Sequence, residues 1–414
     1  MTDRDSRARV LVRTGSDFVE GGRFVGRTDE GRVIFVEDAA PNEVLWVQID
    51  RERRGTLEGH ADELVEASAD RVTPRCSLFG RCGGCSLQHV SYGAQLRAKE
   101  AALESALVRI GRLDLSKVEV APSFASEPYG RRTRARLHVA PARGRPVIGF
   151  YARRSNDIVD VTACPIVSPK LEAALEGVRS ELRRVHRAAE LELVESREGV
   201  LIGAPTELLR ANSISATLDG AARFVDPAFG ALAPEDGQGD HFVSPESFTQ
   251  SHGAGNSALV GDVSAIVDEL RPETILELYA GSGNITRALV AEGRSVLAVE
   301  RDPRSADLFA RAFAGVPRDP RSVEDAVLEL QKGPKRFDLI VADPPREGLP
   351  EPVRRGIVAL RPRAMVLVSC DLAAFARDVG WFAKRGFALD RVRLYDFYPQ
   401  TDHAEVLGRL RAQP

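Results

Sequence analysis

Hydrophobic and polar residues alternate in three different ways along the chain. Between residues 8 and 72, short runs rich in β-branched and aromatic residues, such as Val10–Val12, Arg32–Val36 and Glu43–Ile49, are separated by glycine and proline turns. Several short strands in so short a segment are typical of a small closed barrel. We therefore expect residues 1–72 to form a first, OB-like domain.

The last part of the chain, residues 246–414, alternates strands and helices. Six strands are predicted, the first at Thr274–Leu278 and the last at Glu405–Leu410, with helical stretches between the first five. This order predicts an α/β domain with a doubly wound, mostly parallel sheet. Residues 73–245 lie between the two parts and mix a cysteine-rich loop, a helix over Tyr92–Arg112 and several strands, so we expect a central α+β domain.

Composition places the protein among ordinary globular proteins. Of 414 residues, 43% are apolar and 28% are charged, and the net charge is −3. No apolar run reaches the ~18 residues that a transmembrane helix needs, and the charged N-terminus lacks the apolar centre of a secretion signal. We expect a cytoplasmic protein without a membrane partner, and a monomer. The segment 227–240, which contains proline, glycine, aspartate and alanine, is predicted to be a loop or a weak linker.

A glycine-rich turn follows the first strand of the predicted α/β domain. Gly281 and Gly283 permit a tight turn and a close approach of the backbone to a ligand. Glu300 ends the next strand, where a carboxylate can accept hydrogen bonds from two ribose hydroxyls. The third glycine of a dinucleotide fingerprint is replaced by Thr286. A nicotinamide enzyme is therefore disfavoured against an enzyme that uses S-adenosylmethionine (SAM).

Two later strands of this domain end in residues that can take part in chemistry. Asp343 begins a D-P-P-R run at a strand end, where α/β proteins bind ligands. Arg346 stands where methylases of exocyclic amines place an aromatic residue, which argues against amine methylation. Cys370 ends the next strand, and a thiolate there could add to C6 of a pyrimidine and activate C5. A buried structural cysteine is the alternative, and position alone does not decide between them.

The other cysteines have the spacing of a metal site. Cys76, Cys82 and Cys85 form a C-x5-C-G-G-C pattern, and Cys164 precedes a proline, as some iron–sulfur ligands do. Four thiolates suit a [4Fe–4S] cluster or tetrahedral zinc; the unequal spacing favours the cluster, and disulfides are rare in the cytosol. This assignment leaves Cys370 alone, as expected of a nucleophile.

Methylation at C5 also requires a group that removes the C5 proton. Glu405, which introduces the last strand, is a plausible general base, and His403 is its competitor. Taken by itself, a single glutamate in this position is more often a solvated surface residue.

Together these motifs resemble the RNA uracil-5-methyltransferase family, whose members make 5-methyluridine in ribosomal or transfer RNA. The resemblance covers nearly the whole chain, including an N-terminal region similar to the family's TRAM domain. The motifs that carry it, in family order, are the cysteine pattern with Gln88-His89, Arg132–Arg136, Ser155–Cys164, Glu277–Thr286, Asp343–Gly348, Ser369–Cys370 and His403–Glu405.

The resemblance implies a class I SAM-dependent methyltransferase domain and assigns roles by position. Cys370 matches the nucleophile and Glu405 the base, while the four other cysteines match [4Fe–4S] ligands. The positions that match SAM-binding residues are Gln250, Tyr279, Gly281, Glu300 and Asp343.

The expected partner is RNA, with ribosomal RNA favoured over transfer RNA because some transfer-RNA members lack the cluster cysteines. The barrel, expected to be basic, and the strand with Arg132 and Arg134 would hold RNA phosphates. A rival of another class is a non-catalytic RNA-binding factor, which would not need both Cys370 and Glu405.

The sequence departs from the family pattern at three places. Asp371 follows the thiol, where the family usually has asparagine, and would disfavour a thiolate unless it is paired. His252 replaces the asparagine of the F-x-Q-x-N motif, and Phe24 lies near the usual second glycine of the barrel motif.

Overall fold

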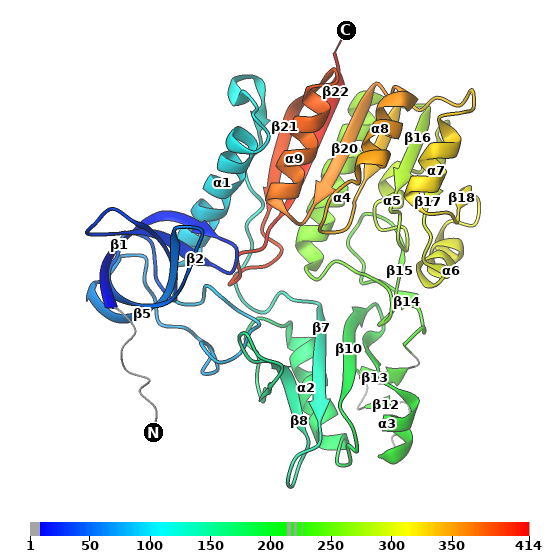
Figure 1. Cartoon of the computed structure of the whole chain (residues 1–414). Coiled ribbons are helices and arrows are strands. Elements are labelled where there is room, and N and C mark those ends of the chain that lie inside the picture. Colours follow the sequence, from blue (N-terminus) through cyan, green and yellow to red (C-terminus); the bar gives the residue numbers. More distant parts are fainter. Residues whose placement is uncertain (1–8, 213–216, 219–221, 226, 414) are drawn as a thin grey trace. The chain divides into compact units, whose positions relative to one another are not determined.

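The computed structural model describes residues 9–212, 217–218, 222–225 and 227–413 (Figure 1). The chain forms two compact units. The first consists of Met1–Glu104, Tyr151–Val159 and Tyr398–His403, and the second of Ser105–Phe150, Asp160–Phe397 and Ala404–Pro414. The division into three domains at residues 72 and 245 stays a prediction.

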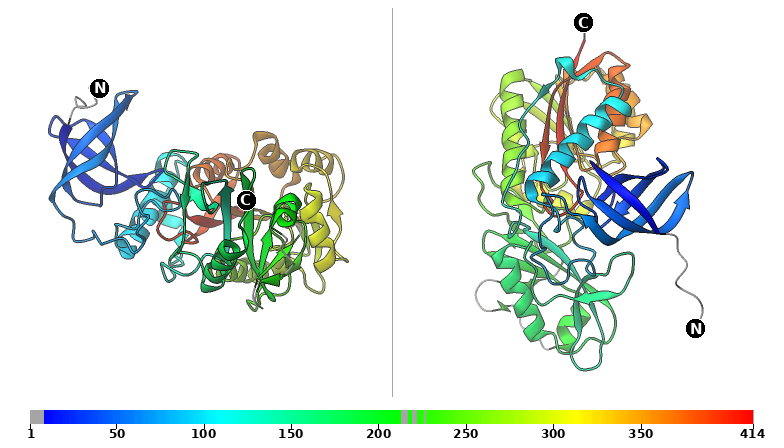
Figure 2. Two further views of the ribbon diagram at one scale, coloured as in Figure 1. Left: turned by 90° about the horizontal axis from the view of Figure 1, so that it is seen from below. Right: turned by 90° about the vertical axis from the view of Figure 1, so that its left-hand side faces the viewer.

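The first unit contains a closed five-stranded barrel in the order β1-β2-β3-β5-β4 (Figure 2). Its strands are β1 (Arg9–Val19), β2 (Arg23–Thr28), β3 (Val33–Glu37), β4 (Val44–Arg53) and β5 (Thr56–Glu66). Inward side chains such as Phe24, Ile34 and Leu45 are fully buried, because alternate residues of a strand point to opposite faces. The predicted barrel is confirmed, and Phe24 serves as part of its core. The helix α1 (Tyr92–Arg109) follows the cysteine-rich loop.

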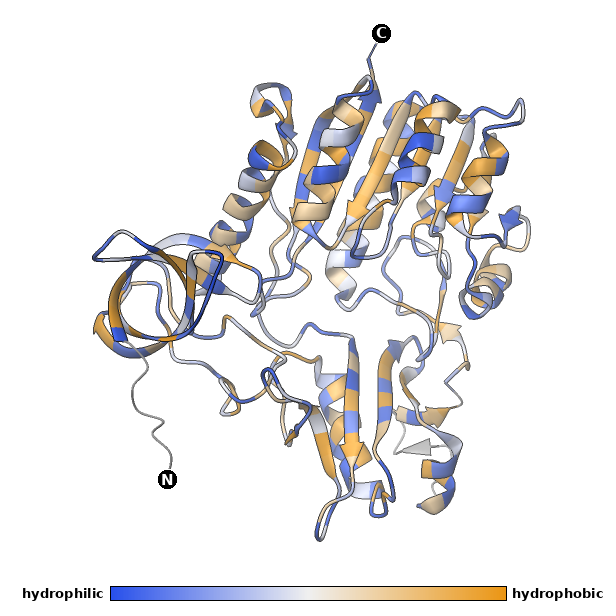
Figure 3. Ribbon diagram, viewed as in Figure 1, coloured by the Kyte–Doolittle hydropathy of each residue, from blue (hydrophilic) through white to orange (hydrophobic). Residues whose placement is uncertain are grey.

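The central part of the second unit is a seven-stranded sheet in the order β12-β13-β11-β10-β7-β8-β9. Figure 3 shows the alternation of hydrophilic and hydrophobic residues along β7, which is typical of a strand with one buried face. The strands are β7 (Arg134–Ala140), β8 (Val147–Tyr151), β9 (Ile158–Asp160), β10 (Ala189–Ser196), β11 (Gly199–Gly203), β12 (Thr217–Leu218) and β13 (Ala222–Val225). The helices are α2 (Pro169–Glu181), which buries its apolar residues and is capped by Ser168, and α3 (Thr206–Ala211).

The remainder of the second unit is built on an eight-stranded sheet in the order β18-β17-β16-β19-β20-β22-β21-β6. The strands are β6 (Glu119–Val120), β16 (Thr274–Leu278), β17 (Ser295–Val299), β18 (Arg318–Asp319), β19 (Leu339–Ala342), β20 (Ala364–Ser369), β21 (Phe387–Tyr395) and β22 (Glu405–Ala412). The helices are α4 (Gly253–Leu270), α5 (Thr286–Leu289), α6 (Pro303–Ala312), α7 (Val323–Leu330), α8 (Glu351–Leu360) and α9 (Leu372–Ala383). Every residue of β20 is buried, and Figure 3 shows this strand as almost uniformly hydrophobic.

The sheet is parallel from β18 to β20, whereas β22 runs antiparallel to both of its neighbours, β20 and β21. The prediction of a doubly wound, mostly parallel sheet is thus confirmed. The predicted loop over 227–240 is partly wrong, because Ala231–Leu232 forms a short strand, β14, that pairs with β15 (Phe242–Val243).

Candidate active site

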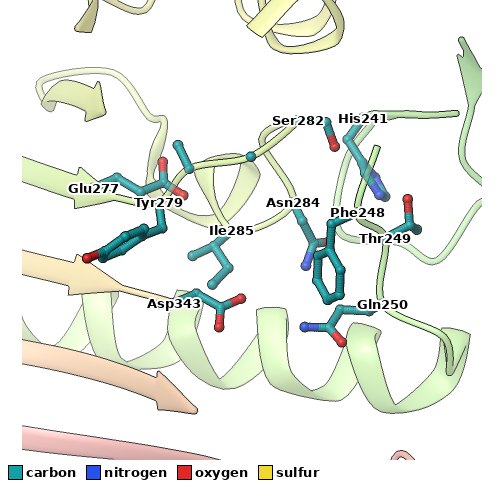
Figure 4. Close-up of a pocket in the computed structure, with 12 residues that line it drawn as sticks. His241, Phe248, Thr249, Gln250, Glu277, Tyr279, Ser282, Asn284, Ile285 and Asp343 are labelled. Carbon is teal, nitrogen blue, oxygen red and sulfur yellow. The ribbon is translucent and has the colours of Figure 1, made fainter. Parts of the chain in front are cut away.

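A pocket opens where β16 and β19 end, at the carboxyl edge of the parallel strands. Figure 4 shows its side chains: Phe248, Gln250 and Asn284 lie together on one side, with Ile285 and Asp343 on the other. The residues that line it are His241, Phe248, Thr249, Gln250, Glu277, Tyr279, Ala280, Gly281, Ser282, Asn284, Ile285 and Asp343. Four of the five residues predicted to bind SAM therefore lie in one pocket.

The fifth, Glu300, is tied to the same glycine turn. Its carboxylate accepts hydrogen bonds from the backbone N–H of Gly281 at 2.9 Å and of Asp302 at 2.6 Å. Gly281 has a φ of +57° and Gly283 a φ of +94°, and a Cβ at Gly283 would lie 2.3 Å from Phe313. The turn thus needs glycine for both its conformation and its packing. The Glu300 carboxylate has further lone pairs with which it could accept hydrogen bonds from ribose hydroxyls.

The sequence reasoning missed the segment between His241 and Thr249. His241 is buried and its Nδ1 has no partner among the described residues; burial, and then the charge of Arg287, lower its pKa to about 4, so the imidazole is neutral at pH 7. Thr249 Oγ1 and Gln250 Oε1 are also buried and unpartnered within the described chain. Buried polar atoms without partners are costly, so these three atoms mark places for polar groups of a ligand. The F-x-Q motif was the only sequence signal near them.

Arg134 holds this segment in place from the neighbouring sheet. Its guanidinium donates to the backbone carbonyls of Pro245, at 2.8 Å, and Ser247, and it pairs with Glu192 at 3.2 Å. Its side chain is only 15% exposed. The prediction that Arg134 binds RNA phosphate is therefore not supported by its position, because its donors are used inside the protein. Arg132 is half-buried, with its backbone N–H bonded to the carbonyl of Ile166.

Cys370 and Glu405 come together through strand pairing. Ser369 of β20 pairs with Val406 of β22 in an antiparallel register, so the next residues, Cys370 and Glu405, are cross-strand neighbours. Asp343 directly follows β19, the parallel neighbour of β20, in which Ala342 pairs with Leu367 of β20. The structure thus brings the predicted nucleophile, the predicted base and the SAM pocket to one sheet edge.

Burial dominates the protonation of these three groups. It raises the pKa of Cys370 to about 12, with the charges of Glu405 and Asp343 adding to the rise. It raises the pKa of Asp343 to about 7, and it raises the pKa of Glu405 well above its ordinary range, again with a contribution from Asp343. Oε2 of Glu405 has no partner among the described residues. Burial thus favours the neutral, protonated forms of these groups, and a cationic ligand beside them would favour their ionised forms.

Two of the departures from the family pattern have structural explanations. Asp371 caps α9, accepting from the N–H of Ala374 at 2.7 Å, and its other oxygen lies 3.9 Å from Arg346 Nε. The helix N-terminus and the arginine offset its charge. His252 caps α4 with Nδ1, which accepts from the N–H of Gly255 at 2.9 Å, the role for which asparagine is also suited.

His403, the competing base, belongs to the first compact unit, where its ring packs edge-on against Tyr398.

The cysteine-rich loop also belongs to the first unit. The N–H of Gly84 donates to Cys82 Sγ at 3.5 Å, and Gln88 Nε2 donates to Cys85 Sγ at 3.3 Å. Gln88 Oε1 accepts from the N–H of Cys76 at 3.1 Å. Cys164 is buried in the second unit, and none of the five cysteines forms a disulfide. Within the described ranges, no three or more Cys, His, Asp or Glu side chains are gathered in the arrangement of a metal site.

The expectation of a basic barrel is wrong. Residues 9–66 contain 8 arginines and no lysine against 13 acidic residues. Many of the arginines are paired with neighbouring carboxylates: Arg9 with Asp62, Arg51 with Glu58, and Arg32 with Glu52. The positive charge of these arginines is therefore offset by carboxylates within the barrel.

As for membranes, the helices of the described residues include none with the length and apolarity to cross a bilayer.

Comparison with known proteins agrees with the geometry. Residues 5–61 match the TRAM domain model. The chain is 33% identical to the 23S rRNA (uracil(1939)-C(5))-methyltransferase RlmD of Edwardsiella ictaluri over 98% of this chain and 96% of the relative. It is 31% identical to RlmD of Pectobacterium atrosepticum over 97% of this chain and 93% of that protein.

Among solved structures, the Pyrococcus abyssi tRNA (uracil-54, C5)-methyltransferase in complex with S-adenosyl-L-homocysteine has the same fold. Its TM-score is 0.70 at 23% identity, and the match covers 97% of this chain and 100% of that one.

Proposed function

Because the chain belongs to the RNA uracil-5-methyltransferase family, we propose that it transfers a methyl group from SAM to C5 of a uridine in 23S ribosomal RNA. The observation that carries the proposal is the pairing of Cys370 with Glu405 beside the pocket that contains Asp343. A protein that only binds RNA has no need of a thiol and a carboxyl group at this place.

The five predicted residues around the glycine turn would bind SAM. Glu300 would accept the ribose hydroxyls, and Gly281 lets the backbone approach the cofactor. Gln250, Tyr279 and Asp343 would surround the methionine half, to which we add His241 and Thr249 because of their unpartnered buried atoms. The sulfonium cation suits a pocket whose carboxyl groups are buried without cations of their own.

Cys370 would act as the nucleophile and Glu405 as the base. The Cys370 thiol loses its proton to solvent as its sulfur bonds to C6 of a flipped-out uridine. The resulting enolate carbon, C5, attacks the SAM methyl group, and S-adenosylhomocysteine leaves. Glu405, ionised at this stage, takes the C5 proton, and the C6–S bond breaks to regenerate the cysteine.

Before methyl transfer, a positive sulfonium would stabilise the Cys370 thiolate, which explains how a thiol with a raised pKa can react at neutral pH. After methyl transfer the sulfonium is gone, and the raised pKa of Glu405 makes its carboxylate a stronger base for the C5 proton.

We also propose that Cys76, Cys82, Cys85 and Cys164 hold a [4Fe–4S] cluster. The N–H donors directed at the sulfurs of Cys82 and Cys85 suit anionic cluster ligands. The cluster would serve as a structural brace between the loop and the segment of Cys164. Iron and sulfide analysis of anaerobically purified protein tests this assignment: four irons are expected, and zinc alone would contradict it.

A second candidate substrate is transfer RNA, favoured by the fold shared with the archaeal transfer-RNA enzyme. Relatives named for 23S ribosomal RNA match over nearly the full chain, which favours the ribosomal substrate. We propose that the enzyme is monomeric and cytoplasmic.

Labelled SAM, unmodified 23S ribosomal RNA and unmodified transfer RNA, assayed side by side with nucleoside mass analysis, test the substrate. Label in 5-methyluridine of 23S RNA is the expected result. Label in transfer RNA alone would move the substrate to the second candidate. Label in neither would favour the non-catalytic RNA-binding factor.

A further inference from the structure

Arginines gather at one end of the seven-stranded sheet, on three segments that are distant in sequence. The segments are the turn between β7 and β8, the loop between α2 and β10, and the end of α3. The arginines are Arg143, Arg145, Arg183, Arg184, Arg187 and Arg210, and all six are exposed. We call this set the basic end of the sheet.

Strand pairing and hydrogen bonds place the three segments together. Val139 of β7 pairs with Ala189 of β10, and Ala140 pairs with Val147 of β8. The β7–β8 turn and the α2–β10 loop therefore lie at the same end of these strands. Asn212, which ends α3, accepts the backbone N–H groups of Arg183 and Arg184 at 2.8 and 2.7 Å. Figure 1 shows the turn that joins β7 to β8, together with the ends of α2 and α3, at one end of this sheet.

The charge of this basic end is little compensated. Arg187 lies 3.8 Å from Glu207, with both side chains more than 70% exposed, so the pair is weak. Within the described part of the chain, the guanidinium groups of Arg143, Arg145, Arg183 and Arg184 form no ion pair. Barrel arginines are, by contrast, extensively paired. A patch of unpaired positive charge attracts polyanions.

The chemistry of these segments fits phosphates. A guanidinium offers a fork of donors that matches phosphate oxygens. The other residues of the β7–β8 turn are proline, alanine and glycine, and Leu182 and Val185 of the second loop are buried. The imidazole of His186 is the one exposed aromatic ring on these two loops, which the structure describes in full. Most contacts would therefore go to the RNA backbone and carry no base sequence.

We propose that this basic end of the central sheet is a second RNA-docking surface, which binds backbone phosphates of a substrate segment remote from the target uridine. The proposal rests on the proposed RNA methyltransferase function. Arg134, at the start of β7, contacts the segment beside the SAM pocket, and Ala140 ends the same strand. At ~3.3 Å per residue, the basic end lies about 20 Å farther along. That distance corresponds to about six stacked nucleotides at ~3.4 Å each.

Two double variants test the proposal: Arg143→Gln with Arg145→Gln, and Arg183→Gln with Arg184→Gln. The matched control is Lys335→Gln with Lys384→Gln, which removes two exposed charges at the opposite edge of the eight-stranded sheet. Filter binding to transcribed 23S ribosomal RNA at several salt concentrations, without SAM, gives affinity and salt slope.

Each test variant should bind severalfold more weakly than wild type, with a salt slope lower by about 1 for each phosphate that it no longer neutralises. In methylation assays, KM for RNA should rise while kcat and KM for SAM stay unchanged. Affinity and slope equal to those of the control variant, with folding confirmed by circular dichroism, would overturn the proposal. Absence of methylation by the wild type would refute the proposed function alone, because the docking surface is judged by binding.

Discussion

The Cys370 thiol should be a poor nucleophile until a cation enters the pocket. Its pKa of about 12, against an ordinary 9.0, leaves ~10⁻⁴ of it as thiolate at pH 8, about 10³-fold less than an ordinary cysteine. A thiolate of higher pKa is intrinsically more reactive, with a Brønsted slope of ~0.4–0.5. The two effects together predict alkylation roughly 30- to 60-fold slower than that of an unhindered thiol.

The sulfonium of SAM should reverse part of this effect. An opposite charge shifts a pKa when it lies within ~4–6 Å of the group; at ~6 Å and an effective dielectric constant of ~20, a unit charge is worth about 3 kcal/mol, or about two pKa units. With the same Brønsted correction, Cys370 should react about tenfold faster with SAM bound than with S-adenosylhomocysteine bound. The two molecules differ by one methyl group and one positive charge.

Iodoacetamide labelling followed by peptide mass analysis measures both ratios. The rate at Cys370 is followed at pH 8 in the folded protein, in the two complexes and in urea-denatured protein, where the same thiol serves as its own reference. A folded-state rate within threefold of the denatured rate would refute the raised pKa. Equal rates in the two complexes would refute the electrostatic role of the cofactor.

Three further predictions concern the pocket and its supports. Burial raises the pKa of Glu277 to about 8, so ionisation of this carboxyl group opposes folding as pH rises from about 4.5 to 8. In Glu277→Gln the side chain can still accept a hydrogen bond from Thr286 but cannot ionise. Between pH 5 and 9 the free energy of unfolding of this variant, measured by thermal melts, should therefore fall less than that of wild type, by on the order of a few kcal/mol. Arg134→Lys should raise KM for SAM several-fold, because it loosens the segment that carries Gln250. The affinity for RNA, measured by calorimetry, should stay the same. Weakened RNA binding with unchanged SAM affinity would show instead that Arg134 is a phosphate ligand. His241→Phe should weaken SAM binding by about tenfold in calorimetry, and unchanged affinity would remove this imidazole from the cofactor site.

The catalytic half of the fold was predictable because its strands are continuous apolar runs. Ala364–Ser369 is buried on both faces, and parallel strands of this kind are readable from sequence alone. The order of the last strands was not readable, since the antiparallel insertion of Glu405–Ala412 depends on pairing partners far away in the chain. That insertion is what brings Glu405 beside Cys370.

The sequence could not show which charged side chains are paired or hydrogen-bonded inside the folded protein. Arg134 stands in an arginine-rich strand that favoured RNA binding, yet its donors hold backbone carbonyls. The arginines of the barrel are likewise paired with carboxylates of the same domain, such as Arg9 with Asp62. His241 was overlooked because a lone histidine beside a loop carries no pattern, and only burial without a partner for Nδ1 distinguishes it.

The covalent intermediate tests the central claim most directly. Wild-type protein, SAM and 23S ribosomal RNA substituted with 5-fluorouridine should yield a stable complex, because fluorine cannot be removed as a proton by Glu405. Digestion and mass analysis should place a methylated fluorouridine on Cys370, and Cys370→Ala should form no such complex. An adduct on another residue, or 5-methyluridine formed by the Cys370→Ala variant, would contradict the account.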